Sequence, residues 1–262
     1  MNKWMEIPGW ACPSPENKLR CERFKKDRFA YNDIENGLRY YQNTSGRDAL
    51  PLIVFLHGAD AVGTDNESQI ALHDVGTVFA DPAWQAKNPC HIVAPQYAKG
   101  RHWALPRMTE YVYELTMHYA EQFHADMSRL YVYGYSAGAI GIFSLLKQHP
   151  IYAAAVPICG ATEAAELEKL LQTPLWLYHA EDDGMVSPNS FEIVYYKEPY
   201  IGSAIIYEKM RRLGHTDIRF TCIPAGEMKE KHHLHPHCSW VLMGEDEEVK
   251  NWLFRHRAHR SD

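Results

Sequence analysis

The sequence predicts an α/β fold: a mostly parallel central sheet flanked by helices on both faces. Two observations predict this class. After about residue 50, short runs that are apolar on both faces alternate with longer helical patterns. Such runs suit strands buried in a parallel sheet. The alternation of strand and helix then implies right-handed crossovers between neighbouring parallel strands.

The individual elements follow from the apolar pattern. We expect strands over 51–56, 91–95, 129–134, 153–158, 174–178 and 218–223. We expect helices over 109–124, 137–148, 162–171, 204–213 and 245–257. The first of these has aromatic and aliphatic residues at spacing four, and the third begins at Thr162, which suits an N-cap.

The N-terminal part differs from this alternation. Residues 23–31 and 37–42 are expected to form an antiparallel hairpin added at the sheet edge. The sequence contains no internal repeat and no linker long enough to separate two domains. We therefore expect a single domain over 1–262.

Composition excludes several classes of partner. The 262 residues are 46% hydrophobic and 23% charged, with a net charge of −6. This balance disfavours nucleic acid or an anionic membrane as the main partner. No apolar run approaches the ~18 residues that span a bilayer, and the first ten residues do not resemble a signal peptide. We expect a soluble, cytoplasmic protein, and the oligomeric state stays open.

One motif points to a nucleophile. Gly134-Tyr135-Ser136-Ala137-Gly138 matches G-x-S-x-G and lies between a predicted strand and a predicted helix, as this motif requires. The turn strains the serine backbone and exposes Ser136 Oγ at the carboxyl end of the sheet. The amide of Ala137, at the helix N-terminus, would point towards a developing oxyanion.

An earlier loop is expected to complete the oxyanion hole. The predicted strand 51–56 ends at His57-Gly58-Ala59-Asp60, and the loop after that strand supplies the second amide in such folds. Ala59 is our choice for this donor and Asp60 the second. His57 precedes the nucleophile, against the expected order of nucleophile, acid and base, so we interpret it as bracing the loop.

Three carboxylates compete for the role of the acid. Glu181, Asp182 and Asp183 follow the predicted strand 174–178. The acid must accept a hydrogen bond from the base and set its tautomer. Asp183 is the best candidate, in an H-x-x-x-D-x-x-V spacing.

The base is expected in a histidine-rich loop after the last predicted strand. His232, His233, His235 and His237 lie there, and the order Ser136, Asp183, His237 agrees with the expected chain order. A zinc site is the alternative, because short histidine-rich tracts bind metal. Neither the glutamate of H-E-x-x-H nor a C-x-x-C pair occurs, so we expect no metal and no cofactor.

These stretches resemble the esterase and predicted-peptidase branch of the α/β-hydrolase superfamily. That branch includes phospholipase/carboxylesterase-like proteins and relatives of polyhydroxybutyrate depolymerases and feruloyl esterases. The matching stretches are 51–59, 93–96, 129–138, 155–160 and 237–240. The resemblance implies an H-x-x-W histidine, which selects His237 over its neighbours, and an H-G-x-x-D-x-x-V-P aspartate. Here Ala180 replaces the glycine of that pattern and Ser187 replaces its proline.

The motifs together predict a serine hydrolase that cleaves a small or medium-sized carboxylic ester through an acyl-enzyme, with an aromatic or sugar-linked ester as one candidate substrate. A serine peptidase of the same fold is the alternative, and a non-catalytic binding protein is a third interpretation. Candidate substrate-binding residues are Gln96, Trp103, Tyr135 and Trp240. The segment 188–202 is longer than the resemblance implies, and we interpret it as a rim or lid insertion.

Overall fold

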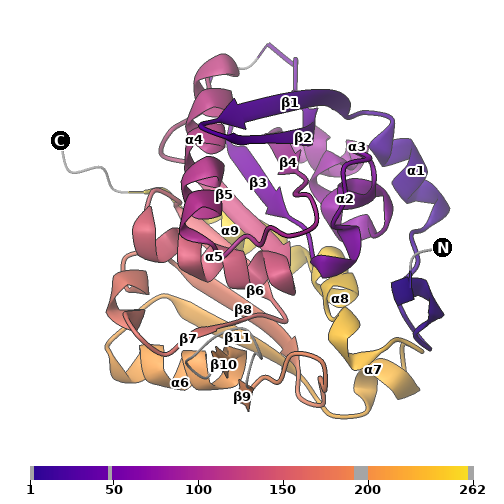
Figure 1. Cartoon of the computed structure of the whole chain (residues 1–262), viewed down its shortest axis with the longest axis vertical. Helices are drawn as coiled ribbons and strands as arrows, with labels where there is room; N and C mark the ends of the chain where they lie inside the picture. Colours follow the sequence, from indigo (N-terminus) through magenta and orange to yellow (C-terminus); the bar gives the residue numbers. More distant parts are fainter. Residues whose placement is uncertain (1–2, 47–48, 192–199, 259–262) are drawn as a thin grey trace.

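The computed structural model describes residues 3–46, 49–191 and 200–258. Its centre is an eight-stranded sheet in the order β1-β2-β4-β3-β5-β6-β8-β11 (Figure 1). The strands are β1 (Lys25–Tyr31), β2 (Ile34–Tyr41), β3 (Leu52–Leu56), β4 (His91–Pro95), β5 (Leu130–Tyr135), β6 (Ala154–Ile158), β8 (Leu175–Ala180) and β11 (Ile218–Ile223). Each of the six strands expected after residue 50 is present.

The sheet is parallel except at one edge. β1 and β2 pair antiparallel as a hairpin, and β2 joins the rest of the sheet antiparallel to β4. All strands from β4 to β11 in that order pair in parallel. The predicted fold class and the predicted edge hairpin are both confirmed.

Helices cover both faces of this sheet (Figure 1). The α-helices in the described residues are α1 (Pro15–Cys21), α2 (Ser68–Ala71), α3 (Pro82–Lys87), α4 (Pro106–Gln122), α5 (Ala137–Gln148), α6 (Ser203–Arg212), α7 (Glu227–Glu230), α8 (Trp240–Glu245) and α9 (Glu247–Arg255). Short 3-10 helices are η1 (Lys3–Glu6), η2 (Ala59–Ala61), η3 (Asp74–Gly76), η4 (Val78–Ala80), η5 (Leu167–Leu170) and η6 (Pro236–Cys238). None of the described helices is both long and apolar enough to span a membrane.

The strands divide the hydrophobic core into two layers, because successive side chains of a strand point to opposite faces. In β3, Ile53 and Phe55 pack into the layer that contains residues of α3, α8 and α9. Leu52, Val54 and Leu56 pack into the layer with α4, α5 and α6. Burial on both faces is why this strand is a continuous apolar run in the sequence.

One expected helix is wrong. Residues 162–171 do not form a helix: β7 (Ala161–Glu163) pairs antiparallel with β10 (Tyr200–Gly202), and η5 follows. β10 also pairs with β9 (Ser190–Phe191), which completes a small second sheet. Thr162 lies opposite Ile201 in this sheet. A pairing between segments so distant in the chain cannot be recognised from the local pattern around Thr162.

Candidate active site

Ser136 occupies a strained turn between β5 and α5. Its backbone has φ 53° and ψ −118°, values that non-glycine residues rarely adopt. The turn is tight because α5 packs directly on β3. A Cβ atom at Gly134 would lie 2.3 Å from the Leu56 carbonyl oxygen, and one at Gly138 would lie 2.0 Å from the same atom. Only glycine fits at either position.

The structure brings three of the predicted residues into one hydrogen-bonded chain. Ser136 Oγ lies 3.0 Å from His237 Nε2, and His237 Nδ1 lies 2.7 Å from Asp183 Oδ2. Ser136 follows β5, Asp183 follows β8, and His237 lies in η6, after β11. The three strands run parallel, so these residues lie together at the carboxyl ends of the strands. His237 and Asp183 are both buried.

The turn around Asp183 holds its carboxylate in place. Asp183 Oδ1 accepts the backbone N–H groups of Met185, at 2.9 Å, and Val186, at 3.1 Å. Burial by itself would raise the pKa of Asp183. The charge of His237 and the hydrogen bonds from His179 and His237 outweigh burial and hold the pKa of Asp183 well below its usual range. The carboxylate therefore stays ionised beside the imidazole.

The two neighbouring acids face away from this chain. Glu181 and Asp182 are exposed. Glu181 Oε2 accepts the backbone N–H of Ala225 at 3.1 Å, and Asp182 Oδ2 accepts that of Gly226 at 2.9 Å. Both carboxylates thus bind the loop that precedes α7.

Ala59 and Ala137 are the two residues predicted to supply oxyanion amides. Ala137 is the first residue of α5 and Ala59 the first residue of η2. A backbone N–H in the first turn of a helix has no partner within that helix. Ala59 lines the same cavity as Ser136 and His237.

A buried polar network supports the loop that carries Ala59. Asp60 Oδ2 lies 2.5 Å from His73 Nε2, and Asp60 Oδ1 accepts the hydroxyl of Tyr135 at 2.7 Å. Tyr135 immediately precedes Ser136, so Asp60 ties the Ala59 loop to the nucleophile turn. Sequence reasoning missed His73, which belongs to no motif.

His57 supports the same loop through contacts with Gly58 and Tyr97. The ring is fully buried: its Nδ1 lies 2.7 Å from the Gly58 carbonyl oxygen, and its Nε2 lies 3.4 Å from the backbone nitrogen of Tyr97. The ring also stacks on Tyr97 at 4.9 Å. Burial lowers the pKa of His57 to about 4, so the imidazole is neutral at neutral pH.

The other histidines of the C-terminal loop are arranged differently from His237. His232 and His233 are exposed. His235 Nδ1 accepts the backbone N–H of His237 at 3.1 Å and thereby caps η6. In the described part of the chain, no cluster of three or more His, Cys, Asp or Glu side chains is arranged to hold a metal ion.

A small aromatic cavity surrounds Ser136. Its volume is about 10 Å³, and the described residues that line it are Trp4, Trp10, Ala59, Asp60, Tyr135, Ser136, His237 and Trp240. A volume near 10 Å³ is close to what one water molecule requires. Trp4 and Trp10 come from the N-terminal segment, which no motif linked to this site.

Two of the four predicted substrate-binding residues lie at this cavity, namely Tyr135 and Trp240. The other two do not line this cavity, and each donates a hydrogen bond to a backbone carbonyl group. Gln96 Nε2 donates to the Ala61 carbonyl at 3.0 Å, and Trp103 Nε1 donates to the His57 carbonyl at 3.0 Å. The predicted rim over 188–202 falls largely on 192–199, which lie outside the described residues.

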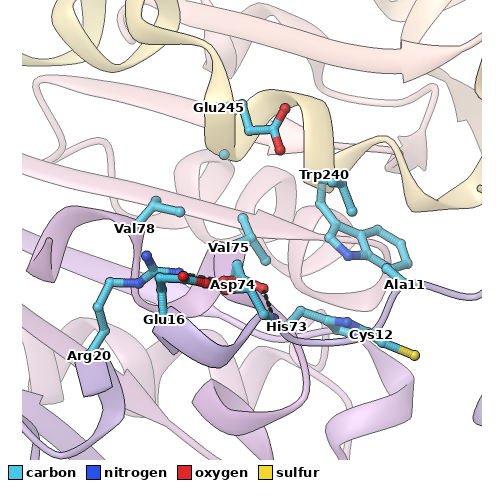
Figure 2. A pocket seen from close by; sticks show the side chains of 13 residues that line it. Ala11, Cys12, Glu16, Arg20, His73, Asp74, Val75, Val78, Trp240 and Glu245 are labelled. Carbon is cyan, nitrogen blue, oxygen red and sulfur yellow. Dashed lines mark hydrogen bonds and ion pairs between the residues drawn. The ribbon is translucent and has the colours of Figure 1, made fainter. Parts of the chain in front are cut away.

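Trp240 also borders a neighbouring pocket of about 370 Å³, shown in Figure 2. Arg20, His73, Asp74 and Glu245 line this pocket, with Arg20 paired to Asp74. Trp240 therefore lines both this pocket and the Ser136 cavity.

Comparison with known proteins supports the predicted class. No family model matches the sequence, and no curated protein does either. Among solved structures, a thermostable esterase shares 29% identity at a TM-score of 0.82, over 91% of this chain and 64% of the esterase. An acylaminoacyl peptidase from Pyrococcus horikoshii shares 14% identity at a TM-score of 0.62, over 95% of this chain and 45% of the peptidase. An ester hydrolase from the metagenome of Lake Arreo shares 14% identity at a TM-score of 0.62, over 94% of this chain and 85% of the hydrolase.

The chain has the α/β-hydrolase fold. Its neighbours are esterases, ester hydrolases and peptidases, so the predicted resemblance to the esterase and peptidase branch is confirmed. The similarity to the thermostable esterase also supports the expectation of a serine hydrolase. The chain spans less than two thirds of the thermostable esterase and less than half of the peptidase.

Proposed function

We propose that this chain is a serine hydrolase that cleaves carboxylic esters through an acyl-enzyme. The observation that carries the proposal is the continuous hydrogen-bonded chain from Ser136 Oγ through His237 to Asp183, with distances of 3.0 and 2.7 Å. A nucleophile, a base within reach of it and a group that orients the base are the parts that this chemistry requires.

In the proposed mechanism, Ser136 Oγ attacks the ester carbonyl carbon while His237 Nε2 takes the hydroxyl proton. Asp183 orients His237 and stabilises the imidazolium that forms. The amides of Ala59 and Ala137 hold the negative charge on the carbonyl oxygen. His237 then gives the proton to the leaving alcohol, and water releases the acid from Ser136 by the same steps.

The cavity favours a small acyl group. A space of about 10 Å³ walled by Trp10, Tyr135 and Trp240 holds about one water molecule, so any acyl group enters only when an aromatic side chain moves, and a small group requires the smaller movement. The similarity to a thermostable esterase supports an ester as substrate. The similarity to an acylaminoacyl peptidase makes a peptidase the second candidate, because the same triad would serve an amine leaving group.

Two measurements test the proposal. A fluorophosphonate probe should label the wild-type protein and not Ser136→Ala. A comparison of p-nitrophenyl esters with aminoacyl p-nitroanilides then separates the candidates, since kcat/KM should be larger for the esters. A wild-type protein that the probe does not label, or equal labelling of Ser136→Ala, would remove the proposal.

A further inference from the structure

The carboxylate of Asp183 contacts a second imidazole besides that of His237. His179, the fifth residue of β8, places its Nε2 3.1 Å from Asp183 Oδ2, the same oxygen that accepts His237 Nδ1. The side chains of both His179 and Asp183 are fully buried. Water therefore does not replace this contact.

The surroundings of His179 determine which of its ring nitrogens carries a proton. Nε2 faces two acceptors, Asp183 Oδ2 and the Val186 carbonyl oxygen at 2.9 Å. A nitrogen between two oxygen acceptors must bear hydrogen. Nδ1 lies 2.8 Å from Ser203 Oγ, a hydroxyl at the start of α6 that can donate or accept. His179 is thus a hydrogen-bond donor to Asp183.

We propose that His179 is a positioning residue for the triad, acting through Asp183. Its Nε2–H shares the carboxylate with His237 and holds Oδ2 in the direction of His237 Nδ1. The inference rests on the proposed function and extends it, because it assigns a role to a residue outside the triad. Ser203 and the Val186 carbonyl clamp the His179 ring in the orientation that this role needs.

The arrangement predicts the direction of a pH effect. When Asp183 accepts a hydrogen bond from His179, less of its negative charge is available to the imidazolium of His237. Loss of that donor should leave more of the carboxylate charge facing the His237 ring. The acidic limb of the pH–rate profile would then move to higher pH.

Other titratable groups also face the Asp183–His237 pair and stay unchanged in the test. They are Cys159 directly after β6, Asp60 of η2, and His235 and Cys238 of the η6 segment. Because only residue 179 differs between the test variants, a change in profile between them is attributable to that residue.

Two variants of His179 form a matched pair. The amide nitrogen of Gln reaches the position of Nε2, so His179→Gln keeps a donor to Asp183. The shorter side chain of His179→Asn places its amide on the Nδ1 side, towards Ser203, and loses that donor. The readout is the second-order rate of Ser136 labelling by a fluorophosphonate, measured from pH 5 to 9, together with the melting temperature.

We expect His179→Asn to label about 10²-fold more slowly than wild type, less than the about 10⁴-fold loss associated with an Asp→Asn change in a triad. Its acidic midpoint should rise by about one pH unit. His179→Gln should keep the wild-type midpoint and most of the rate. Equal loss in both variants with an unchanged midpoint would mean that His179 only fills space, and would overturn the inference.

Ser203→Ala provides the test if the His179 variants do not fold. It removes only the hydroxyl behind Nδ1 and should slow labelling by about tenfold in a folded protein. A folded Ser203→Ala with wild-type rate and profile would contradict the inference. Failure of the wild-type protein to label removes the proposed function itself, whereas normal wild-type labelling with an unchanged His179→Asn removes only the role of His179.

Discussion

The indole of Trp10 packs against the imidazole of His237, with ring centroids 5.9 Å apart. Trp10 also contacts Trp240 edge-on, with ring centroids 5.5 Å apart, and stacks with Trp4 at 5.4 Å. The backbone fixes this placement, because the Gly9 carbonyl accepts the N–H of His235 at 2.7 Å. The N-terminal segment therefore forms one wall of the proposed active site.

Truncation of this wall should change substrate size preference. We expect Trp10→Ala to raise the ratio of kcat/KM for p-nitrophenyl octanoate to that for p-nitrophenyl acetate by about tenfold or more, because space opens beside Ser136. Trp10→Phe keeps an aromatic ring and should change the ratio less. An unchanged ratio in a folded Trp10→Ala would show that the acyl chain lies elsewhere.

Removal of the nucleophile should abolish turnover without unfolding the protein. Ser136→Ala is expected to lower kcat by about 10⁶. Alanine at this position experiences nearly the same backbone strain at φ 53° as serine does. The melting temperature should therefore stay near that of wild type. Esterase activity within tenfold of wild type would remove Ser136 from the mechanism.

The three acids of the β8 turn should separate clearly. Asp183→Asn is expected to lower kcat by about 10⁴, because an amide at this position favours the wrong tautomer of His237. Asp182→Asn and Glu181→Gln serve as matched controls, since their carboxylates bind the backbone before α7. A large loss of kcat in Asp182→Asn together with nearly full activity in Asp183→Asn would contradict the assignment.

The histidines should separate in the same way. His237→Ala should inactivate the enzyme, whereas His232→Ala, at an exposed position of the same loop, should keep most of the activity. Wild-type activity should survive EDTA. Loss of activity on chelation that zinc restores would favour the metal alternative instead.

Burial of His57 should make stability depend on pH. The folded pKa of about 4 lies below the ordinary 6.5, so the unfolded chain binds a proton that the folded chain excludes. The stabilising contribution is complete above pH 6.5 and is lost as the pH falls from 6.5 towards 4. Its full size is roughly 3 kcal/mol.

Urea unfolding at pH 7 and pH 5 measures this effect. The free energy of unfolding of wild type should fall more between these values than that of His57→Gln, by about 1–2 kcal/mol. The variant is the reference because it lacks the titrating ring, whatever its absolute stability. Equal losses in both proteins would show that His57 does not contribute to the pH dependence.

The sequence by itself determined the sheet and the candidate triad. Strands such as 51–56 are recognisable because burial on both faces requires an unbroken apolar run. The turn at Ser136 is recognisable because close packing on Leu56 leaves room only for glycine at 134 and 138. The chain order limited the acid and the base to two short loops, and the resemblance to the hydrolase branch selected His237 among the four histidines.

Only the tertiary structure decided which other side chains reach these residues. Gln96 and Trp103 donate hydrogen bonds to backbone carbonyl groups and do not line the Ser136 cavity. Trp10, His73 and His179 instead lie around the triad and its supporting loop. Likewise, Thr162 joins a strand because Ile201 lies opposite it. Periodicity and motifs describe neighbours along the chain, and these contacts join segments that become neighbours only when the sheet and its loops have folded.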